Sequence, residues 1–387
     1  MRQSNVSSDP RLDRLPAIAD LMRLAERRMP RFAWEYFAMG TGRETTLARN
    51  ESAFDTIRFC PNFLRGALVP DLSTTLFGDA YASPLGVSPI GMSSLMWPGS
   101  ERALAALAGT RGIAYCLSTV AADSIENIGP VAAPRGWFQL YPPGDTDVRA
   151  DLIRRARDAG FRVLVVTVDI PVPSMRERAR RAQVSVPPRM TPRIVADVAR
   201  RPRWALETLR RGSPRFMNLV PYAGTEDLAA QSRYVGRALG HQMDWAWIAE
   251  VRALWDGPLV LKGILHPDDA ARAVAEGVDG VWVSNHGGRQ LDAAPAAIDA
   301  LPLVRERLGP DATVLMDGGV RGGLDALRAI HLGADFVFAG RPFIAGVAAL
   351  GTARASHALD ILEAELANVM TQLGIARIDR IGALTRA

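Results

Sequence analysis

The stretch TVLMDGGVRGGLDALRAIHLGADFVFAGR, residues 313–341, contains one complete unit of the fold that we predict for this chain. Two short apolar runs, Thr313–Met316 and Phe336–Ala339, have the length and composition of buried β-strands. Between them, Gly323–Leu332 has apolar residues three and four positions apart, which is typical of an amphipathic helix. A strand, a helix and a second strand in this order form the repeating unit of a parallel sheet.

The same alternation extends through most of the 387 residues. Further apolar runs that qualify as strands are Leu85–Ser88, Tyr115–Ser118, Trp137–Leu140, Val163–Val168, Leu259–Leu261 and Gly280–Val283. Helical patterns follow most of them, at Glu101–Gly109, Ser124–Ile128, Asp147–Ala159, Pro267–Glu276 and Ala296–Leu308. Eight buried strands that alternate with helices predict an α/β fold, the (β/α)8 or TIM barrel. An open doubly wound sheet is the alternative, but the sequence has neither a GxGxxG after the first strand nor the GK pair of a P-loop.

A single domain over residues 1–387 accounts for this pattern, with additions to the barrel in three places. Residues 1–75 hold an N-terminal helical cap and a lead-in, and the barrel follows over residues 76–355. About 90 residues separate the fourth strand from the fifth, whereas the other gaps are about 20 to 30, so we expect residues 170–240 to form an excursion that acts as a lid. Residues 356–387 form a C-terminal helix and tail.

The positive charge of the chain is concentrated in this excursion. The formal net charge is +5, yet residues 176–215 alone contain 12 arginines against three acidic residues. An anionic surface such as lipid headgroups is one interpretation of this patch, and a solvated face is the other. We expect residues 188–222 to be mobile or to lie on a surface and to be dispensable for the chemistry, because Trp204, Leu206 and Phe216 are interleaved with the arginines.

Polar side chains lie just after the predicted strands, at the end of the barrel where enzymes of this architecture carry their active sites. Glycine and arginine dominate after the last two strands, in DGGVRGG (317–323) and GR (340–341). Glycines let backbone N–H groups approach an anion and arginines bind it through two donors, so these loops predict a phosphate site. In SNHGGRQLD (284–292), His286 is suited to proton abstraction near neutral pH and Arg289 to holding a carboxylate.

Lys262 is the only lysine, and the other 45 basic residues are arginines. It follows the fifth predicted strand, where we expect a compact ammonium in a place that a guanidinium would not fit. The two cysteines, Cys60 and Cys116, match neither a disulfide framework nor a zinc ligand set, so we expect no metal and a reducing cytoplasmic setting. The polar residues 1–15 lead us to expect no signal peptide.

Five separated motifs occur in order at the predicted strand ends: TVD (167–169), LKG (261–263), SNHGGRQLD (284–292), DGGVRGG (317–323) and GRPF (340–343). Together they resemble the FMN-dependent 2-hydroxy-acid oxidases and dehydrogenases, and the resemblance extends over about residues 25–374. It implies an enzyme that uses FMN to oxidise a 2-hydroxy carboxylate to the 2-oxo acid. The segment PRFAWEYFAMGTGRETTLARN (30–50) is also similar to the opening of the family, which places a tyrosine, here Tyr36, over the substrate.

The resemblance implies a role for each matching position. The residues that it assigns to FMN are Pro89, Ile90, Gly91, Ser118, Gln139, Thr167, Lys262, Ser284, Asp317, Gly318, Gly319, Val320, Arg321, Gly340 and Arg341. Those that it assigns to the substrate are Tyr36, Tyr141, Arg176, His286 and Arg289. His286 would act as the catalytic base, Asp169 would stabilise its imidazolium, and Lys262 would stabilise negative charge on the reduced flavin.

Three departures from the family pattern bear on the pocket. Ile90 replaces the usual threonine, so its contact with the flavin would be through the backbone. Gly91 stands where many members have alanine, and glycine there is similar to the mandelate dehydrogenase branch. Val120 replaces an aromatic residue of the glycolate oxidases. Less bulk at both positions predicts a bulky or aromatic, mandelate-like (S)-2-hydroxy acid.

The segment RPRWALETLRRG (201–212) is similar to the membrane-docking segment of the same branch. This similarity implies a peripheral protein on the inner face of the cell membrane that passes electrons to a quinone. The alternative is a soluble cytoplasmic oxidase of the L-lactate or glycolate type that reduces oxygen to peroxide. The family also implies a homotetramer, and we expect no nucleic-acid partner.

Overall fold

The computed structural model describes residues 10, 12–182, 184, 191–225, 227–239 and 243–383. Eight parallel strands form a closed barrel: β3 (Leu85–Val87), β4 (Ala114–Ser118), β5 (Gly136–Leu140), β6 (Val163–Thr167), β7 (Leu259–Ile264), β8 (Gly280–Val283), β9 (Thr313–Met316) and β10 (Phe336–Ala339). Each strand pairs with the next in chain order, and β10 closes the barrel on β3. The predicted (β/α)8 barrel is confirmed, and the last three strands have the predicted bounds.

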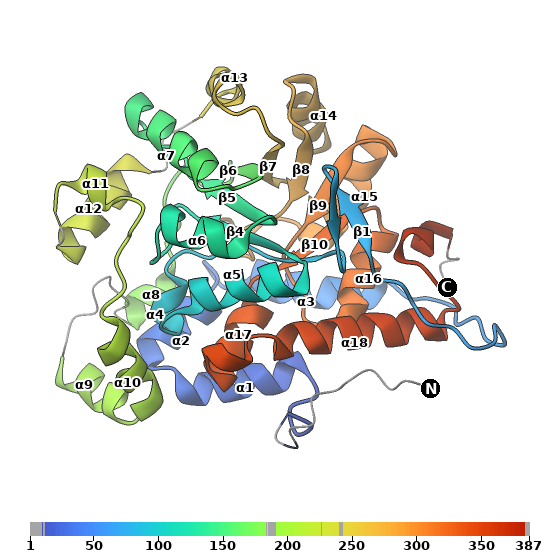
Figure 1. Cartoon of the computed structure of the whole chain (residues 1–387), viewed down its shortest axis with the longest axis horizontal. Helices are drawn as coiled ribbons and strands as arrows, with labels where there is room; N and C mark the ends of the chain where they lie inside the picture. Colours follow the sequence, from blue (N-terminus) through green and yellow to red (C-terminus); the bar gives the residue numbers. More distant parts are fainter. Residues whose placement is uncertain are drawn as a thin grey trace.

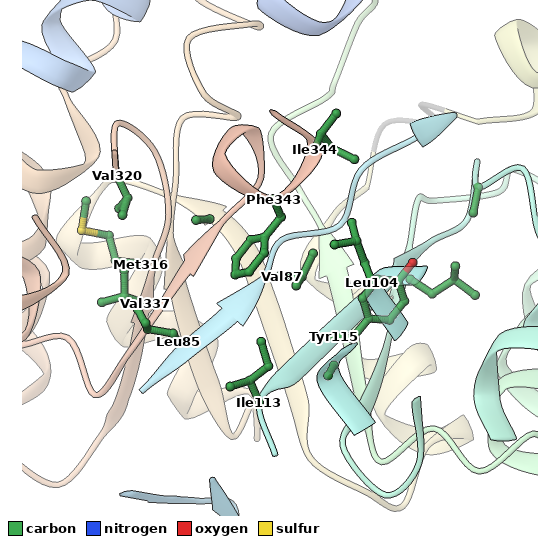
Figure 2. Packing of buried hydrophobic residues seen from close by; sticks show 14 of the residues in the cluster. Leu85, Val87, Leu104, Ile113, Tyr115, Met316, Val320, Val337, Phe343 and Ile344 are labelled. Carbon is green, nitrogen blue, oxygen red and sulfur yellow. The ribbon is translucent and has the colours of Figure 1, made fainter. Parts of the chain in front are cut away.

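Helices cover the outside of the barrel (Figure 1). Those that the sequence predicted between strands are α5 (Ser100–Arg111), α6 (Ile125–Ala132), α7 (Thr146–Asp158), α14 (Pro267–Ala275), α15 (Ala297–Leu308) and α16 (Gly323–His331). Outside the segment between β6 and β7, α4 (Ser93–Met96) after β3 and α17 (Arg341–Leu350) after β10 were not predicted. Figure 2 shows how the layers meet, with Leu85 and Val87 of β3, Val337 of β10 and Phe343 of α17 packed together.

The inside of the barrel is filled by aromatic side chains. Trp282 and Phe338 have ring centroids only 4.0 Å apart, and Trp137 packs edge-on against Trp282. A hairpin of β1 (Thr74–Leu76) and β2 (Asp79–Tyr81), which the sequence did not predict, adds Leu76 and Tyr81 to this cluster. Phe77 at its turn contacts the start of β8, so the hairpin closes the N-terminal end of the barrel.

Helices from both ends of the chain pack beneath the barrel in Figure 1. The N-terminal cap consists of α1 (Ile18–Arg28), α2 (Arg31–Ala38) and α3 (Thr45–Ser52), and a short 3-10 helix (Ala53–Thr56) follows. The predicted C-terminal helix is α18 (His357–Gln372). The N-terminal cap matters for the site, because α2 and α3 bring Tyr36 and Asn50 to the C-terminal end of the barrel.

The excursion between β6 and β7 is mostly helical. It contains α8 (Glu177–Arg181), α9 (Pro192–Ala199), α10 (Pro202–Arg211), α11 (Val220–Ala223), α12 (Leu228–Ala238) and α13 (Trp245–Leu254), and α9 and α10 project together in Figure 1. None of the helices that the structure describes has the length and apolarity that crossing a bilayer requires.

The segment 188–222, which was expected to be mobile or to lie on a surface, packs on the protein through two of its three interleaved apolar residues in the described part, residues 191–222. Trp204 and Phe216 are only 6% and 7% exposed. The Trp204 ring packs edge-on against Phe32, with centroids 5.6 Å apart, and its Nε1 donates to the backbone oxygen of Met96 at 3.1 Å. The two aromatic residues therefore attach the segment to the barrel and its cap, and Leu206 alone of the three is exposed. Residues 188–190 lie outside the described part.

Candidate active site

A cavity of about 520 Å³ opens at the C-terminal end of the barrel strands. Its wall includes most of the predicted site residues: Tyr36, Pro89, Ile90, Gly91, Tyr141, Thr167, Arg176, Lys262, His286, Arg289, Asp317, Gly318, Gly319, Val320, Arg321, Gly340 and Arg341. The other four, Ser118, Gln139, Asp169 and Ser284, lie outside this wall, and each makes a hydrogen bond within the group of predicted residues. The structure thus brings together side chains from the N-terminal cap, the excursion and most of the strand ends.

His286 lies between an acidic and a phenolic side chain. Its Nδ1 is 2.9 Å from Asp169 Oδ1, and its Nε2 is 3.4 Å from the hydroxyl of Tyr141. The backbone of His286 is left-handed (φ 56°), and its N–H donates to Ser284 Oγ at 3.1 Å. When Nδ1–H is donated to the carboxylate, Nε2 is left as the basic nitrogen on the side of Tyr141.

Two opposite effects set the pKa of Asp169. Burial raises it, but the charge and hydrogen bond of His286 and the charge of Lys262 outweigh burial and lower the pKa below its usual value. Gly263 leaves space for this carboxylate, because a Cβ on Gly263, whose φ is 105°, would lie 2.5 Å from Asp169 Cγ. Asp169 is therefore ionised near neutral pH and held beside the imidazole.

Lys262 is almost completely buried, with 4% of its surface exposed. Its Nζ is 2.8 Å from Ser284 Oγ and 3.1 Å from Asp317 Oδ2. Ser284 also donates to Asp317 Oδ1, and Ser88 donates to Asp317 Oδ2 at 3.1 Å. An ammonium surrounded this closely leaves little room for the larger planar guanidinium, which agrees with the solitary lysine.

Arg289 and Arg341 have no ion pair with a carboxylate in the described part of the chain. Burial and the charge of Arg176 lower the pKa of Arg289 to about 10, and burial and the charges of Arg321 and Arg289 lower that of Arg341 to about 9. Each guanidinium donates to a backbone oxygen at 3.0 Å, from Arg289 to Tyr36 and from Arg341 to Met39. Buried cations without acidic partners indicate that the cavity is built for anions.

The FMN that the resemblance implies fits this cavity on two observations. The uncompensated cation of Arg341 lies beside the glycine-rich loop 317–321, as a phosphate group requires. Gln139 Nε2 is buried and has no hydrogen-bond partner among the described residues, whereas its Oε1 accepts from Ser118 Oγ at 2.8 Å. A buried amide N–H₂ without a partner is satisfied when a ligand with polar ring atoms is bound.

The prediction of a wide pocket depends on Gly91 and Val120, and these two residues lie next to each other. A Cβ on Gly91 would lie 2.6 Å from Val120 Cγ2 and 3.8 Å from the hydroxyl of Tyr36. The Val120 side chain thus occupies the volume that a methyl group at position 91 would need. The room in this part of the cavity depends on the pair and not on either residue alone.

Two sets of residues at the site were not predicted from the sequence. Asn50 and Asn285 exchange amide hydrogen bonds of 2.8 and 2.7 Å, which join α3 to the loop that carries His286. Phe216, Val235 and Leu239 of the excursion line the cavity. The quoted opening of the family ends at Asn50, but no periodic pattern singles out any of these side chains.

Comparison with known proteins agrees with this geometry. The family model for FMN-dependent dehydrogenases matches residues 25–385. An L-lactate dehydrogenase of Stenotrophomonas maltophilia (strain K279a) is 37% identical over 370 residues, which are 95% of this chain and 97% of that protein. A putative L-lactate dehydrogenase of Mycobacterium tuberculosis (strain ATCC 25618 / H37Rv) is 37% identical over 377 residues, 97% of this chain and 90% of that protein.

Among solved structures, the monotopic membrane protein (S)-mandelate dehydrogenase is 32% identical, with a TM-score of 0.91 over 96% of this chain and 99% of that chain. A mandelate oxidase is 31% identical, with a TM-score of 0.79 over 96% of this chain and 99% of that chain. The barrel, the anion-binding cavity and matches along nearly the whole length lead to one conclusion. The chain belongs to the FMN-dependent 2-hydroxy-acid dehydrogenase family and is an FMN-dependent oxidoreductase.

Proposed function

We propose that this enzyme oxidises an (S)-2-hydroxy carboxylate with a bulky or aromatic side chain, such as a mandelate-like acid, and passes the electrons to a quinone at a membrane surface. One observation carries the proposal of acid oxidation. The His286–Asp169 pair stands in the same cavity as Arg176 and Arg289, two guanidinium groups without carboxylate partners in the described structure. A base and a carboxylate clamp are what removal of hydrogen from a 2-hydroxy acid requires.

The residues that we propose to hold FMN are those named from the resemblance. Arg341, Arg321 and the loop 317–319 would bind its phosphate, while Gln139, Ser118 and Thr167 would meet its polar ring edge. Lys262 would offer its ammonium where negative charge develops, held in place by Ser284 and Asp317. When bound, FMN supplies a two-electron acceptor for the carbon that carries the hydroxyl group. The side chains then determine orientation and proton transfer.

Each substrate-binding side chain has a distinct task in this proposal. Arg176 and Arg289 bind the carboxylate, and each charge-assisted hydrogen bond contributes about 1.5–3 kcal/mol. Tyr36 and Tyr141 orient the hydroxyl group. His286 accepts a proton at Nε2, either from C2 or from the hydroxyl group, and Asp169 stabilises the imidazolium that results.

The α9–α10 surface supports attachment to a membrane. Val195, Leu206 and Leu209 are 49%, 51% and 81% exposed on it, among the arginines of residues 193–211. Apolar side chains surrounded by cations suit a helix pair that lies on anionic lipid. The similar (S)-mandelate dehydrogenase is itself described as a monotopic membrane protein. Such a position, peripheral on the inner face of the cell membrane, would give the reduced enzyme access to quinone.

We also propose a homotetramer, as the resemblance implies. Phe63, Leu64 and Val69 support self-association, because all three are largely exposed in one segment between the N-terminal cap and β1. Exposed apolar side chains close together are typical of subunit interfaces.

Anaerobic flavin bleaching should separate the two substrates that the relatives suggest. We expect an (S)-mandelate-like acid to reduce the flavin faster than lactate or glycolate, because Val120 is smaller than the aromatic residue of the glycolate oxidases. L-lactate is the second candidate, favoured by the names of the curated relatives. Reoxidation in a stopped-flow instrument tests the acceptor. Fast reaction with oxygen and none with a quinone would contradict a dehydrogenase, and faster reduction by glycolate would contradict the aromatic substrate.

Replacing two exposed leucines should release the protein from lipid. We expect Leu206→Glu with Leu209→Glu to weaken binding to anionic vesicles at low salt at least about tenfold, because burying one leucine contributes about 1.5–3 kcal/mol. Vesicle sedimentation measures this, and turnover with a soluble dye should not change. Leu303→Glu on α15, an equally exposed leucine (55%), is the control and should bind like the wild type. If the wild-type protein does not bind such vesicles, the patch is a solvated face.

A further inference from the structure

We infer that helix α12 and Phe216 form the wall of the cavity that selects the side chain of the substrate. Gly236 of this helix leaves room at the entrance of the cavity for an aromatic group. The inference rests on the proposed function, which it extends from the reaction to a selecting element of the excursion. Phe216, Val235, Gly236 and Leu239 all line the cavity, although they lie far along the chain from the motifs. Figure 1 shows α12 beside α11, on one side of the barrel.

The C-terminal end of α12 is tied to the loop that carries Tyr141. Leu239 forms an isolated β-bridge with Pro143, and the N–H of Gly144 donates to the oxygen of Ala238 at 3.1 Å. The hydroxyl of Tyr141 in turn lies 3.4 Å from His286 Nε2. The end of the helix is therefore fixed to the loop that supplies Tyr141 to the site.

Two buried amide side chains attach the other part of the wall. Asn218 Nδ2 donates to the backbone oxygens of Ser118 and Thr119, at 3.3 and 3.2 Å, directly before Val120. Gln231 of α12 accepts from the N–H of Phe216 at 3.2 Å, and both amide residues are completely buried. Phe216, α12 and the Val120 loop are thus joined by satisfied hydrogen bonds, which hold the wall in one position.

The chemistry of the wall is apolar. Phe216, Val235 and Leu239 face the same cavity as Val120 and Ile170, and no charged residue of α12 is among the lining residues. Arg176, Arg289 and His286 account for the carboxylate and the reacting carbon. The remaining substituent on C2 has to meet the apolar wall, which would be left poorly filled by the single methyl group of lactate.

Gly236 has no evident packing reason to be glycine. It lies inside α12, where glycine costs about 0.5–1 kcal/mol relative to alanine. A Cβ at this position would have no heavy atom within 4 Å, and the φ of Gly236 is not in the left-handed range. Gly236 is exposed and lines the cavity, so we expect a side chain here to project at the entrance and to narrow it without disturbing the helix.

The test compares Gly236→Phe with the wild-type holoenzyme on mandelate and lactate. We expect the rate constant for flavin reduction divided by the substrate dissociation constant to fall about 10- to 200-fold for mandelate, and much less for lactate. Binding of the 2-oxo acid benzoylformate, followed by the perturbation of the oxidised flavin spectrum, should weaken in parallel. Val235→Ala widens the same wall and should shift the mandelate-to-lactate ratio in the opposite direction.

Arg237→Phe is the matched control, since it adds the same ring on the same helix at an exposed position that does not line the cavity. Its substrate ratio should equal that of the wild type. If the mandelate-to-lactate ratio is unchanged in both Gly236→Phe and Val235→Ala while FMN content and melting temperature are retained, the inference is wrong. The proposed function is not affected by that result. If no 2-hydroxy acid reduces the flavin of the wild-type enzyme, both the proposed function and the inference are wrong.

Discussion

Replacing His286 with alanine is expected to slow reduction of the flavin by the 2-hydroxy acid by about 10²–10⁴-fold while FMN stays bound. The imidazole has a carboxylate partner, with Nδ1 2.9 Å from Asp169 Oδ1. The pKa of Asp169 is lowered, so this carboxylate keeps its charge to a lower pH than a free aspartate and can stabilise the imidazolium throughout the neutral range.

Anaerobic stopped-flow absorbance at the flavin band measures the effect directly. His266→Ala is the control, because His266 lies at the N-terminus of α14, where it accepts from the N–H of Asp268 and does not line the cavity. That variant should reduce like the wild type. Near-normal reduction of His286→Ala would remove His286 from the reaction and leave it a structural role.

Lys262→Met is expected to lower the same rate by about 10²–10³-fold, the usual effect of removing one preorganised donor at developing negative charge. The side chain is the only ammonium of the chain and is fixed by Ser284 and Asp317. Methionine keeps its length and loses its charge, which also leaves Asp317 buried without its partner. Lys262→Arg should be nearly as damaging, because the guanidinium does not fit this site.

Flavin content and the reduction potential separate catalysis from loss of the cofactor. We expect the potential of Lys262→Met to fall, because the reduced flavin loses a stabilising charge. Arg272→Met, which removes an exposed cation from α14, is the control and should leave both the rate and the potential unchanged. A potential equal to that of the wild type would contradict the assigned role of Lys262.

The barrel could be predicted because each buried strand is a short continuous apolar run between glycine-rich turns. The β1–β2 hairpin could not, since its strands have three residues each and only one buried side chain apiece. The packing of the excursion could not be predicted for a related reason. The interleaving of Trp204 with arginines is visible in the sequence, but it does not tell whether protein or lipid covers a side chain such as Trp204. Phe32 and Met96 cover it here.

Some residues of the candidate site could likewise be predicted from the sequence, and others could not. Residues at strand ends, such as Lys262 and His286, are brought to one cavity by the topology alone, so their convergence follows once the barrel is recognised. Asn50 and Phe216 reach it from elements whose position depends on tertiary packing. Their contacts with Asn285 and Gln231 join residues far apart in the sequence, and these contacts have no local signal.

Among the described residues, the aromatic filling of the barrel closes the route to the cavity from the N-terminal end of the strands. Trp137, Trp282 and Phe338 occupy the interior, and the β1–β2 hairpin seals its far end. Reactants are therefore expected to reach the cavity from the C-terminal end of the strands. Since the 2-oxo acid leaves at the end where the next 2-hydroxy acid enters, we expect the two acids to compete for the cavity.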